Sequence, residues 1–359
     1  MKKKRAVRIL LWTGAGLLAV VLGYVIYVFA AYYRLEDRLP LEVSAGEATS
    51  SAQTGVPYRA VSYNIGFGAY SADYSFFMDG GRESRARSEA AVEENVGGAA
   101  QAAAALEGDL YFFQEVDVDG TRSHHVDESR LLEERLGEGY DWVFAQNYDS
   151  PYLFWPPLEP HGANRSGLLT ASAFPIDDSL RRQLPVEAGV RKLLDLDRCY
   201  TVHRIQVEGG RELVLYHLHL SAYTSDGAIA EEQLRLVLAD MYAEYQAGNY
   251  VIGAGDFNKD LLGNSGEVFG VSGEDYTWAQ PIPTDLIPQG LRLVAPLDEA
   301  GPVPSCRNAD RPYGPDSFVL TVDGFVVSDN VAVLGSGVSD TGFAWSDHNP
   351  VYLDFLLEP

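Results

Sequence analysis

Polar side chains of a particular kind stand beside several apolar, strand-like runs of the sequence. They are carboxylates, amides and imidazoles, the groups that bind hard cations or move protons. Such a group costs free energy next to a buried strand unless it finds a partner. The positions are Asn64 in SYNIGFG, Glu115 in YFFQEVD, His217 and His219 in VLYHLHLSAY, Asp256 and Asn258 in VIGAGDFNKD, Asp323 in VDGFVVS, and Asp347 and His348 in SDHNP. Each alone has an ordinary interpretation as a turn or a solvated side chain, but together they indicate one site.

The chemistry that these residue types allow is phosphoester hydrolysis. Carboxylate and amide oxygens suit Mg²⁺ or Mn²⁺, and these ions also bind phosphate oxygens. Histidines beside carboxylates are oriented donors for a developing negative charge or a leaving group. The sequence has no GxSxG, HExxH or GxxxxGK[ST] motif, which disfavours the usual competing hydrolase and nucleotide-binding classes.

About nine strand-like runs and three helical patterns must position these residues. The strand-like runs are 58–65, 110–116, 141–146, 166–174, 201–207, 212–220, 250–257, 323–328 and 351–357. The helical patterns are 84–106, 129–136 and 231–245. Several strands are apolar throughout, as expected when both faces of a sheet are covered. The pattern predicts one large α/β domain in which two sheets pack together.

The ordered set of motifs resembles the endonuclease/exonuclease/phosphatase superfamily, whose fold is that of pancreatic-type deoxyribonuclease. The similarity extends over residues 57–359. It implies a four-layer α/β sandwich of two packed mixed sheets flanked by helices, with the site at one edge of the sheets. It also implies that Asn64 and Glu115 hold a catalytic Mg²⁺ (or Mn²⁺), and that Asp347 assists a metal or the surrounding network.

The resemblance also implies roles for the remaining residues of the set. Asp256 would position or deprotonate the attacking water, with Asn258 beside it. His348, oriented by Asp323, would stabilise the pentavalent phosphorus. His219 matches a histidine that lies near the leaving oxygen in phosphodiesterase members.

Four further features of the sequence have both a structural and a functional interpretation. His217 stands where many relatives have Asn, and strand alternation puts it on the same side as His219. The aromatic and proline-rich segment 147–169, which carries Asn164 and Arg165, is either a packed connection or a substrate-facing lip. The third feature is the cluster of Arg82, Arg85 and Arg87, which is either a set of solvated charges or a phosphate clamp. The fourth is the pair His124 and His125, which belongs either to a surface loop or to the substrate contacts.

The first 33 residues have a different character from the rest. Residues 1–8 carry five positive charges, and residues 9–33 carry no charge at all. The uncharged run is long enough to cross roughly 30 Å of hydrocarbon as a helix. A cleaved signal peptide is the alternative, but the run is long for one and its tyrosines suit a membrane interface. We therefore expect a cytoplasmic tail (1–8), a single transmembrane anchor (9–33), a linker (34–56) and an extracytoplasmic domain (57–359).

The charge of the chain limits its possible binding partners, and its cysteine content limits its possible disulfides. Five of the 27 basic residues precede the uncharged run, which leaves 22 against 51 acidic residues. Nucleic-acid grooves need clustered Lys and Arg, so nucleic acid is a possible but disfavoured partner. Cys199 and Cys306 could form one disulfide or remain two buried thiols. Protein partners are not indicated.

Three functions remain open at this stage. The first is a metal-dependent phosphodiesterase or phosphatase that acts outside the membrane on a small or lipid-linked phosphoester. The second is an extracellular nuclease. The third is an inactive binding module on the same fold, which would predict losses among the ligand positions, and none is seen. The superfamily includes nucleases, sphingomyelinases and phosphoinositide phosphatases, so the fold leaves the substrate undetermined.

Overall fold

The computed structural model describes residues 2–189, 192, 197–222, 228–273, 276, 278, 280–298 and 300–359. Its described α-helices are α1 (Lys2–Ala31), α2 (Glu89–Ala104), α3 (Glu128–Leu136), α5 (Ala228–Gln246) and α6 (Ser265–Phe269). The strands of one sheet are β1 (Leu39–Pro40), β6 (Asp178–Gln183), β7 (Cys199–Gln206), β8 (Glu212–His219), β9 (Tyr250–Asp256), β13 (Asp323–Ser328) and β10 (Leu291–Val294). The strands of the other are β14 (Val331–Val338), β15 (Val351–Leu357), β2 (Pro57–Asn64), β3 (Leu110–Gly120), β5 (Asn164–Ser172) and β4 (Asp141–Asp149). A short ladder joins β11 (Cys306–Arg307) to β12 (Val319–Leu320).

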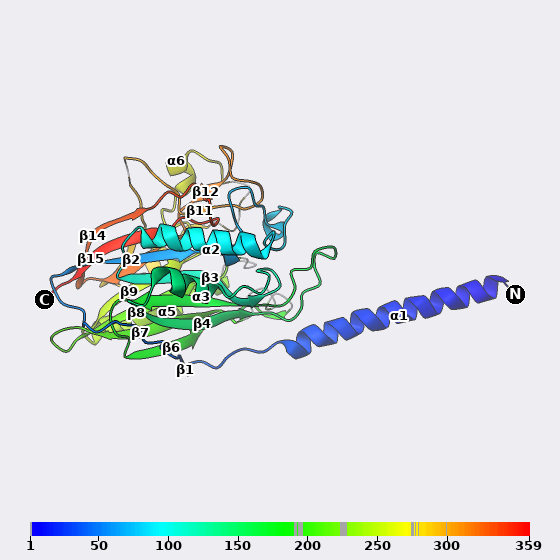
Figure 1. Ribbon diagram of the computed structural model, residues 1–359, viewed down its shortest axis with the longest axis horizontal. Helices are drawn as coiled ribbons and strands as arrows, with labels where there is room; N and C mark the ends of the chain where they lie inside the picture. Colours follow the sequence, from blue (N-terminus) through cyan, green and yellow to red (C-terminus); the bar gives the residue numbers. More distant parts are fainter. Residues whose placement is uncertain are drawn as a thin grey trace.

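The two large sheets pack face to face, with helices outside them (Figure 1). Both sheets are mixed, because β2 pairs with β3 and β8 with β9 in parallel, whereas their other pairings are antiparallel. Helices α2 and α3 cover the six-stranded sheet, and α5 covers the seven-stranded sheet. The predicted four-layer α/β sandwich of two packed mixed sheets is therefore confirmed.

Strand β3 shows why apolar runs of this chain become central strands. Tyr111 and Phe113 face the α2 layer, whereas Leu110 and Phe112 face the other sheet. All four side chains are buried, so the strand has no solvated face. Burial of such side chains on both faces stabilises the sandwich by about 1.5–3 kcal/mol for each large side chain.

Helix α2 begins and packs for identifiable reasons. Ser88 accepts a hydrogen bond from the amide of Ala91 and so caps the helix four residues after the predicted start. The segment before it is irregular and bonds to other loops. Small side chains on the buried face, including Ala99 and Ala103, allow the helix to lie close to the sheet.

The sequence patterns missed the edge strands β1, β10 and β14, the strand β6 next to the edge, and the short pair β11–β12. Edge strands expose one side and carry polar residues, so they lack the apolar signal of central strands. The segment 34–56, which we expected to be a linker, also differs: Leu39 and Pro40 pair with β6, Ser44 with β4, and Ala52 is fully buried. This segment is part of the domain surface rather than a free spacer.

Most of helix α1 extends away from the domain (Figure 1). Its large apolar side chains are mostly exposed. It is long and apolar enough to span a membrane, a property that a membrane anchor and a signal sequence share. The two cysteines do not pair. Cys199 and Cys306 are both free and buried, which decides between the two alternatives that the sequence left open.

Candidate active site

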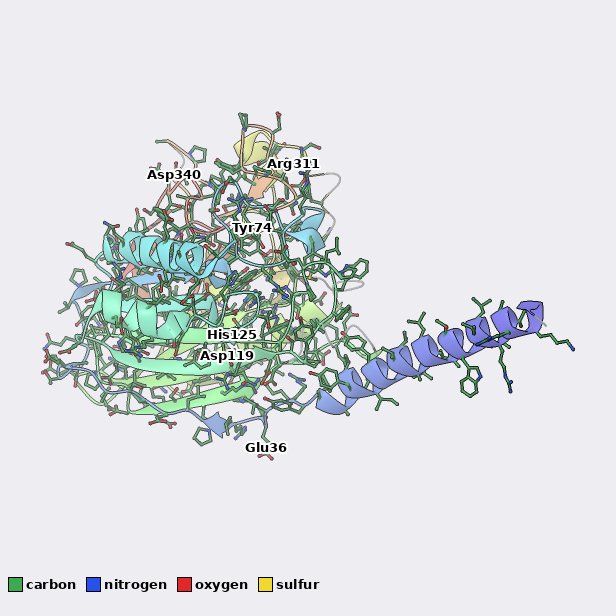
Figure 2. The ribbon with its side chains drawn as sticks, turned by 45° about the vertical axis from the view of Figure 1, so that its right-hand side comes forward. Glu36, Tyr74, Asp119, His125, Arg311 and Asp340 are labelled. Atoms are coloured by element: carbon green, nitrogen blue, oxygen red, sulfur yellow. The ribbon has the colours of Figure 1, made fainter. Side chains whose placement is uncertain are left out.

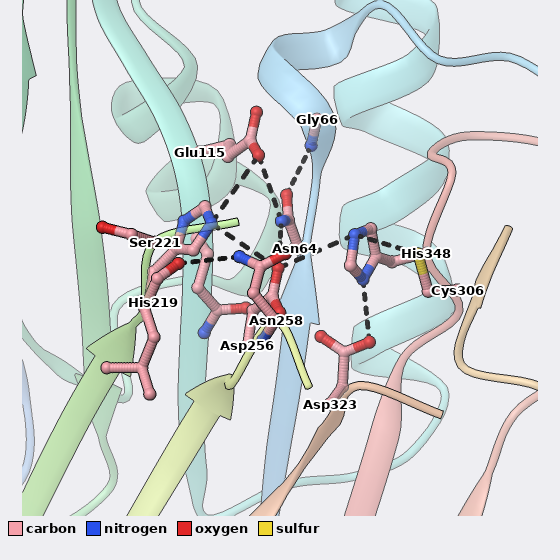
Figure 3. Close-up of polar contacts among 12 residues, drawn as sticks. Asn64, Gly66, Glu115, His219, Ser221, Asp256, Asn258, Cys306, Asp323 and His348 are labelled. Atoms are coloured by element: carbon pink, nitrogen blue, oxygen red, sulfur yellow. Dashed lines mark hydrogen bonds and ion pairs between the residues drawn. The ribbon is translucent and has the colours of Figure 1, made fainter. Parts of the chain in front are cut away.

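Three neighbouring strands bring three of the predicted residues into one row at an edge of the seven-stranded sheet. His219 ends β8 and pairs in register with Asp256, which ends β9. Asp256 pairs in turn with Asp323, which begins the antiparallel strand β13. Asn64 ends β2 of the facing sheet and donates a hydrogen bond to Asp256 across the gap, 3.1 Å long. The site therefore forms where the ends of both sheets meet (Figure 3).

The second sheet contributes Asn64 and Glu115. The amide of Asn64 donates to Glu115 Oε1 at 3.2 Å, and its oxygen accepts from the backbone of Gly66 at 3.0 Å. Glu115 lies at a bulge in β3 between Phe113 and Val116 and has a positive φ of 55°. A non-glycine residue in this conformation is strained, and bulges of this kind commonly re-aim a side chain at a functional site. Here the bulge turns Glu115 toward Asn64.

Asp323 and His348 form a buried carboxylate–imidazole pair. His348 Nδ1 lies 2.8 Å from Asp323 Oδ2, and the hydroxyl of Ser305 donates to the same oxygen at 2.7 Å. Burial opposes the charged imidazolium, but Asp323 and Cys306 together outweigh burial and raise the pKa of His348 well above its usual value. The free nitrogen, Nε2, lies 3.8 Å from Asp256 and 3.6 Å from the sulfur of Cys306.

Asp256 lies at the centre of the constellation. Its Oδ2 is 3.5 Å from His219 Nε2 and accepts the Asn64 amide, while its Oδ1 accepts the backbone N–H of Asn258 at 2.8 Å. Asn258 also has a positive φ, 48°, and its side chain donates to the carbonyl of Leu220. Burial, partly offset by His348, raises the pKa of Asp256 to about 7.

Burial shifts the pKa values of both His219 and Asp347. Burial lowers the pKa of His219 well below its usual value, and its Nδ1 is buried without a hydrogen-bond partner among the described residues. Burial also raises the pKa of Asp347, and the nearby Glu115 charge adds to this effect. The hydroxyl of Ser346 donates to Asp347 at 3.3 Å and to the backbone oxygen of Asn64 at 2.7 Å.

The segment that carries Asp347 and His348 is fixed by packing at its two ends. The indole of Trp345 lies directly on Gly98 of α2, where a Cβ would overlap the ring. The side chain of Asn349 accepts from Thr341 and donates to the carbonyl of Pro304. Glycine is also required at Gly255, which has a φ of 145° and whose added Cβ would overlap the carbonyl of Leu218 on the parallel neighbour.

A depression opens over these residues, and we refer to it as the catalytic depression. It has two lobes that share Tyr70, Glu115, Arg198 and His219. One lobe contains the polar centre with Asp256, Asp347 and His348. The other combines the aromatic rings of Phe67, Tyr70, Phe76 and Tyr148 with polar side chains that include Arg122. Arg122, Arg198 and Arg307 supply positive charge to the walls and were not among the predicted site residues. No local motif marks them, because their relevance comes only from the folded arrangement.

Arg122 is held rigidly in its lobe. Its guanidinium pairs with the buried Asp117 at 2.7 Å and lies 3.9 Å from the ring centre of Phe67. Tyr148 flanks it at 5.4 Å. A guanidinium that is paired and stacked in this way keeps a fixed donor geometry.

Three predicted substrate-binding residues lie elsewhere. His217 is fully buried between the sheets, with its nitrogens 2.7 Å from Gln114 and 2.9 Å from Thr170. It shares a strand face with His219, as expected, but the adjoining sheet covers it before it reaches the depression. Asn164 is buried and bonds to the backbone of Arg122 and His161, and Arg165 is exposed and is not among the described residues that line the depression. The structure does not bring these three side chains to the polar centre.

The two remaining clusters lie on the surface. Arg87 pairs with Asp73, and Arg85 donates to the carbonyl of Pro160, so the arginine cluster is engaged outside the depression. Figure 2 shows His125 beside Asp119, where both side chains are largely exposed. His124 bonds to the carbonyl of Ala86. For these groups the surface interpretation agrees with the structure.

The donor set fits a divalent metal ion of the hard class. Glu115, Asp256 and Asp347 present carboxylate oxygens to one depression, and the buried side chain of Asn64 contacts Glu115 and Asp256. The raised pKa values of Asp256 and Asp347 result first from burial and then, in part, from neighbouring carboxylates, so the site concentrates negative charge that a cation would neutralise. Asp256, Asp323 and His348 also form a compact buried group of ligand atoms. Oxygen-rich sites of this type suit Mg²⁺ or Mn²⁺.

A two-sheet sandwich with a buried Asp–His pair and clustered acidic and amide ligands at one edge defines a class of phosphoester-hydrolysing folds. The sequence model of the endonuclease/exonuclease/phosphatase family matches residues 61–348. The chain therefore belongs to the endonuclease/exonuclease/phosphatase family. Members of this family are typically phosphoester hydrolases and are generally dependent on divalent metal ions. No curated protein sequence matches the chain.

Solved structures share the fold at low sequence identity. An endonuclease/exonuclease/phosphatase protein from Beutenbergia cavernae is 20% identical, with a TM-score of 0.51, and the alignment covers 84% of this chain and 72% of that one. TDP2 from Caenorhabditis elegans is 13% identical, with a TM-score of 0.52 and coverages of 84% and 75%. ANGEL2, described as a 2′,3′-cyclic phosphatase, is 16% identical, with a TM-score of 0.54 and coverages of 89% and 99%. At these identities the comparison supports the fold alone.

Proposed function

We propose that this protein is a divalent-metal-dependent phosphoester hydrolase that is anchored in the cytoplasmic membrane, with its catalytic domain on the outer side. The observation that carries the proposal is the meeting of Asn64 and Glu115 with Asp256 and the Asp323–His348 pair in one depression. These groups come from different strands of both sheets. A solvated surface or a set of unrelated turns would not bury them together.

The chain's own residues have distinct roles in this proposal. Asp256 orients the attacking water and accepts its proton, and Asn258 fixes the Asp256 carboxylate through its backbone N–H. His348 donates Nε2–H to a nonbridging oxygen as negative charge develops there, and Asp323 orients the imidazole and favours its protonated form. His219, on the opposite side of Asp256, faces the leaving oxygen.

Asn64, Glu115 and Asp347 would hold the metal ion. When bound, such an ion polarises phosphate oxygens and neutralises charge in the transition state. The strained backbone at Glu115 supports this assignment, because the bulge aims a carboxylate at a position where burial alone would disfavour it.

The membrane location rests on α1. The helix carries five basic residues before position 9 and none of its side chains from residue 9 to 31 is charged. The excess of Lys and Arg on the short flank favours a cytoplasmic N-terminus. The domain that follows then lies outside the cytoplasm.

The experiment measures hydrolysis by the full chain in detergent with Mg²⁺ or Mn²⁺. The substrates are an aryl diester, an aryl monoester, plasmid DNA and phospholipid vesicles. We expect turnover of at least one phosphoester, its loss in EDTA and its return with either ion. Glu115→Gln should lower kcat by at least ~10²-fold, because a ligand and its charge are lost.

The control variant is Glu134→Gln, which removes an exposed carboxylate of α3 outside the depression. It should keep full activity. Full activity of the wild type in EDTA would refute metal dependence, and cleavage of plasmid DNA with no other substrate turned over would replace the proposal by the nuclease alternative. Absence of turnover with every substrate would favour the inactive binding module.

A further inference from the structure

The connection between β4 and β5 exposes a concentrated apolar surface. Its exposed side chains are Tyr152 (38%), Phe154 (56%), Trp155 (66%) and Leu158 (100%). We refer to residues 150–163 as the aromatic loop. Outside residues 1–33, the other large apolar side chains exposed among the described residues are Met78, Tyr313 and Leu334, and they are dispersed along the chain. A patch of adjacent aromatic and aliphatic residues on a soluble surface indicates a binding partner.

The aromatic loop is a built structure. Its two arms form an antiparallel bridge between Leu153 and Gly162. Ser84 donates to the carbonyl of Glu159, and His161 bonds to the carbonyl of Ser84 at 2.8 Å. The base of the loop is therefore fixed to the domain, while its apolar tip stays uncovered.

The same loop lies against the last turns of α1. The hydroxyl of Tyr24 accepts from the backbone of Phe154 at 3.0 Å and donates to the carbonyl of Tyr152 at 3.1 Å. The hydroxyl of Tyr27 accepts from the backbone N–H of Tyr152 at 3.1 Å, and the rings of Tyr24 and Phe154 meet edge to face. In Figure 1 the loop, drawn in green, projects from the domain on the side where α1 leaves it.

These contacts set the depth of the loop in a bilayer that α1 spans. Tyr27 and Tyr24 precede the end of α1 at Ala31 by four and seven residues, or about 6 and 10 Å along the axis. The loop thus lies beside the helix at the level of the helix residues Tyr24 and Tyr27. Tyrosine and tryptophan concentrate at the membrane–water interface, and this loop adds such side chains next to those of α1.

A second contact also indicates that the membrane–water interface lies near the end of α1. The ammonium of Lys192 lies 4.0 Å from the ring centre of Tyr32 and 5.7 Å from that of Phe29. A lysine that crosses aromatic rings near the end of a membrane helix suits the interface, where its charge remains hydrated.

We infer that the aromatic loop inserts into the bilayer that α1 spans, at the membrane–water interface on the extracytoplasmic side. The bilayer is then the partner of this surface. Charge favours apolar insertion over attraction to anionic lipid, because the loop contains one acidic residue, Glu159, and no Lys or Arg, in a chain of net charge −24. Binding of this kind depends on buried apolar area and needs no anionic headgroup.

The inference has a consequence for substrates, and this part rests on the proposed function. His161, at the base of the aromatic loop, lines the same lobe of the catalytic depression as Glu115 and His219. Insertion of the loop therefore holds the mouth of the depression at the lipid surface. The substrate class that this geometry serves is a phosphoester carried by a membrane lipid.

The first experiment measures depth. The native cysteines are buried, so a single environment-sensitive fluorophore can be attached to Leu158→Cys, and to Leu334→Cys as the matched exposed control. The full chain is reconstituted in phosphatidylcholine vesicles that contain lipids brominated along the acyl chains near the headgroup. We expect strong quenching at position 158 and none at position 334. Equal behaviour at the two positions would overturn the inference.

A further result of the same experiment would also overturn it. If the probe at position 158 is shielded from an aqueous quencher and is not quenched by brominated lipid, a protein covers the loop and the bilayer is not its partner. Sedimentation in detergent would then show whether that protein is a second copy of this chain.

The second experiment tests the substrate class. It compares p-nitrophenyl hexadecyl phosphate in phosphatidylcholine vesicles with p-nitrophenyl methyl phosphate in solution. Combining Phe154→Ser, Trp155→Ser and Leu158→Ser should lower the ratio of the vesicle rate to the solution rate by about tenfold or more, because the depression is no longer held at the surface. Leu334→Ser should keep the wild-type ratio. An unchanged ratio in the triple variant would refute the lipid-linked class, whereas no turnover of either ester would count against the proposed function and leave the quenching result to decide on the surface.

Discussion

Asp347 and His348 are neighbours in sequence, yet their side chains have different partners. Asp347 lies near Gly66 and feels the charge of Glu115, whereas His348 bonds to Asp323 on the other sheet. The chain bends at Asp347 before it reaches His348, so the two side chains have different surroundings and one dipeptide can serve both halves of the site. This explains why an acid and an imidazole adjoin immediately before a strand.

The two imidazoles that flank Asp256 should respond differently to the leaving group. His348 is proposed to act on charge at phosphorus, so His348→Ala should lower kcat by ~10²–10⁴-fold for every substrate. His219 is proposed to face the leaving oxygen, so His219→Ala should matter much less for a p-nitrophenyl ester, whose leaving group needs no proton, than for an alkyl diester. The measurement is kcat for both variants on both esters.

Equal losses on the two esters would show that His219 is a second transition-state or structural residue rather than a group that assists the leaving oxygen. A loss on neither ester would remove His219 from the mechanism. Asp323→Asn provides a control for orientation, because it keeps the size of the His348 partner and alters its charge and tautomer preference.

At the scale of elements, helix α2 positions the segment that carries His348. Two adjacent glycines of this helix have different surroundings, which gives a matched pair of variants. A Cβ at Gly98 would overlap the indole of Trp345, whereas a Cβ at Gly97 would meet only the guanidinium of Arg135 at 3.6 Å. The helix surface at Gly98 is thus part of the support of His348.

Gly97→Ala should therefore stabilise the protein by up to about 1 kcal/mol through helix propensity. Gly98→Ala should destabilise it by roughly 1–3 kcal/mol through overpacking and should lower kcat as the segment with Trp345 shifts. Urea unfolding and kcat measure the two effects. If Gly98→Ala resembles Gly97→Ala in both, the packing of Trp345 does not position the site.

Strands β6 and β7 enclose a histidine that makes stability depend on pH. His203 is fully buried, and its nitrogens each lie 2.7 Å from a hydroxyl, those of Ser179 and Thr201. Burial lowers the pKa of His203 to about 3. The unfolded chain, with a histidine pKa of about 6.5, then binds more protons between these two values.

Stability contributed by neutral His203 is therefore present above pH ~6.5 and is lost as the pH falls toward 3. Each pH unit in this window costs about 1.4 kcal/mol for one such group. His203→Gln should reduce the slope of unfolding free energy against pH by about this amount between pH 6 and 5. Urea unfolding of both proteins at several pH values measures it, and identical slopes would show that His203 is protonated in the folded protein.

At the scale of the whole molecule, α1 and the domain are joined by more than the chain. Arg34, just after the helix, donates to the carbonyls of Leu184 and Arg198 and lies 3.8 Å from Asp197. The β1 pairing continues this attachment along the seven-stranded sheet. The domain is thus held close to the end of the helix, and the membrane would limit its orientation.

Protease added to intact cells should remove the domain and leave a small membrane-embedded fragment that contains α1. The physical reason is the uncharged run 9–33, which favours the bilayer, and its basic flank, which favours a cytoplasmic N-terminus. Immunoblotting of an N-terminal tag in membrane fractions measures the fragment. Recovery of a soluble secreted form that starts near residue 31 would identify the run as a signal peptide.

The sequence by itself determined the fold class and most members of the site, because central strands and hard ligands have local signals. Apolar runs predicted one α/β domain with two packed sheets, and the family resemblance of the motifs implied the four layers. Residues such as Asn64 and Asp256 stood out as polar groups at the ends of these runs. The edge strands β1, β10 and β14 were not predicted, since their exposed side removes the apolar pattern.

Only the tertiary structure decided which polar groups share a site and which serve the core. His217 and His219 have the same strand, spacing and alternation, but the facing sheet covers His217 and leaves His219 at the open edge. Arg122 is held at the depression by its ion pair with the buried Asp117 and by the ring of Phe67, which lies far from it in sequence. Local patterns report which groups a strand carries, whereas packing between the sheets sets which of them meet solvent and one another.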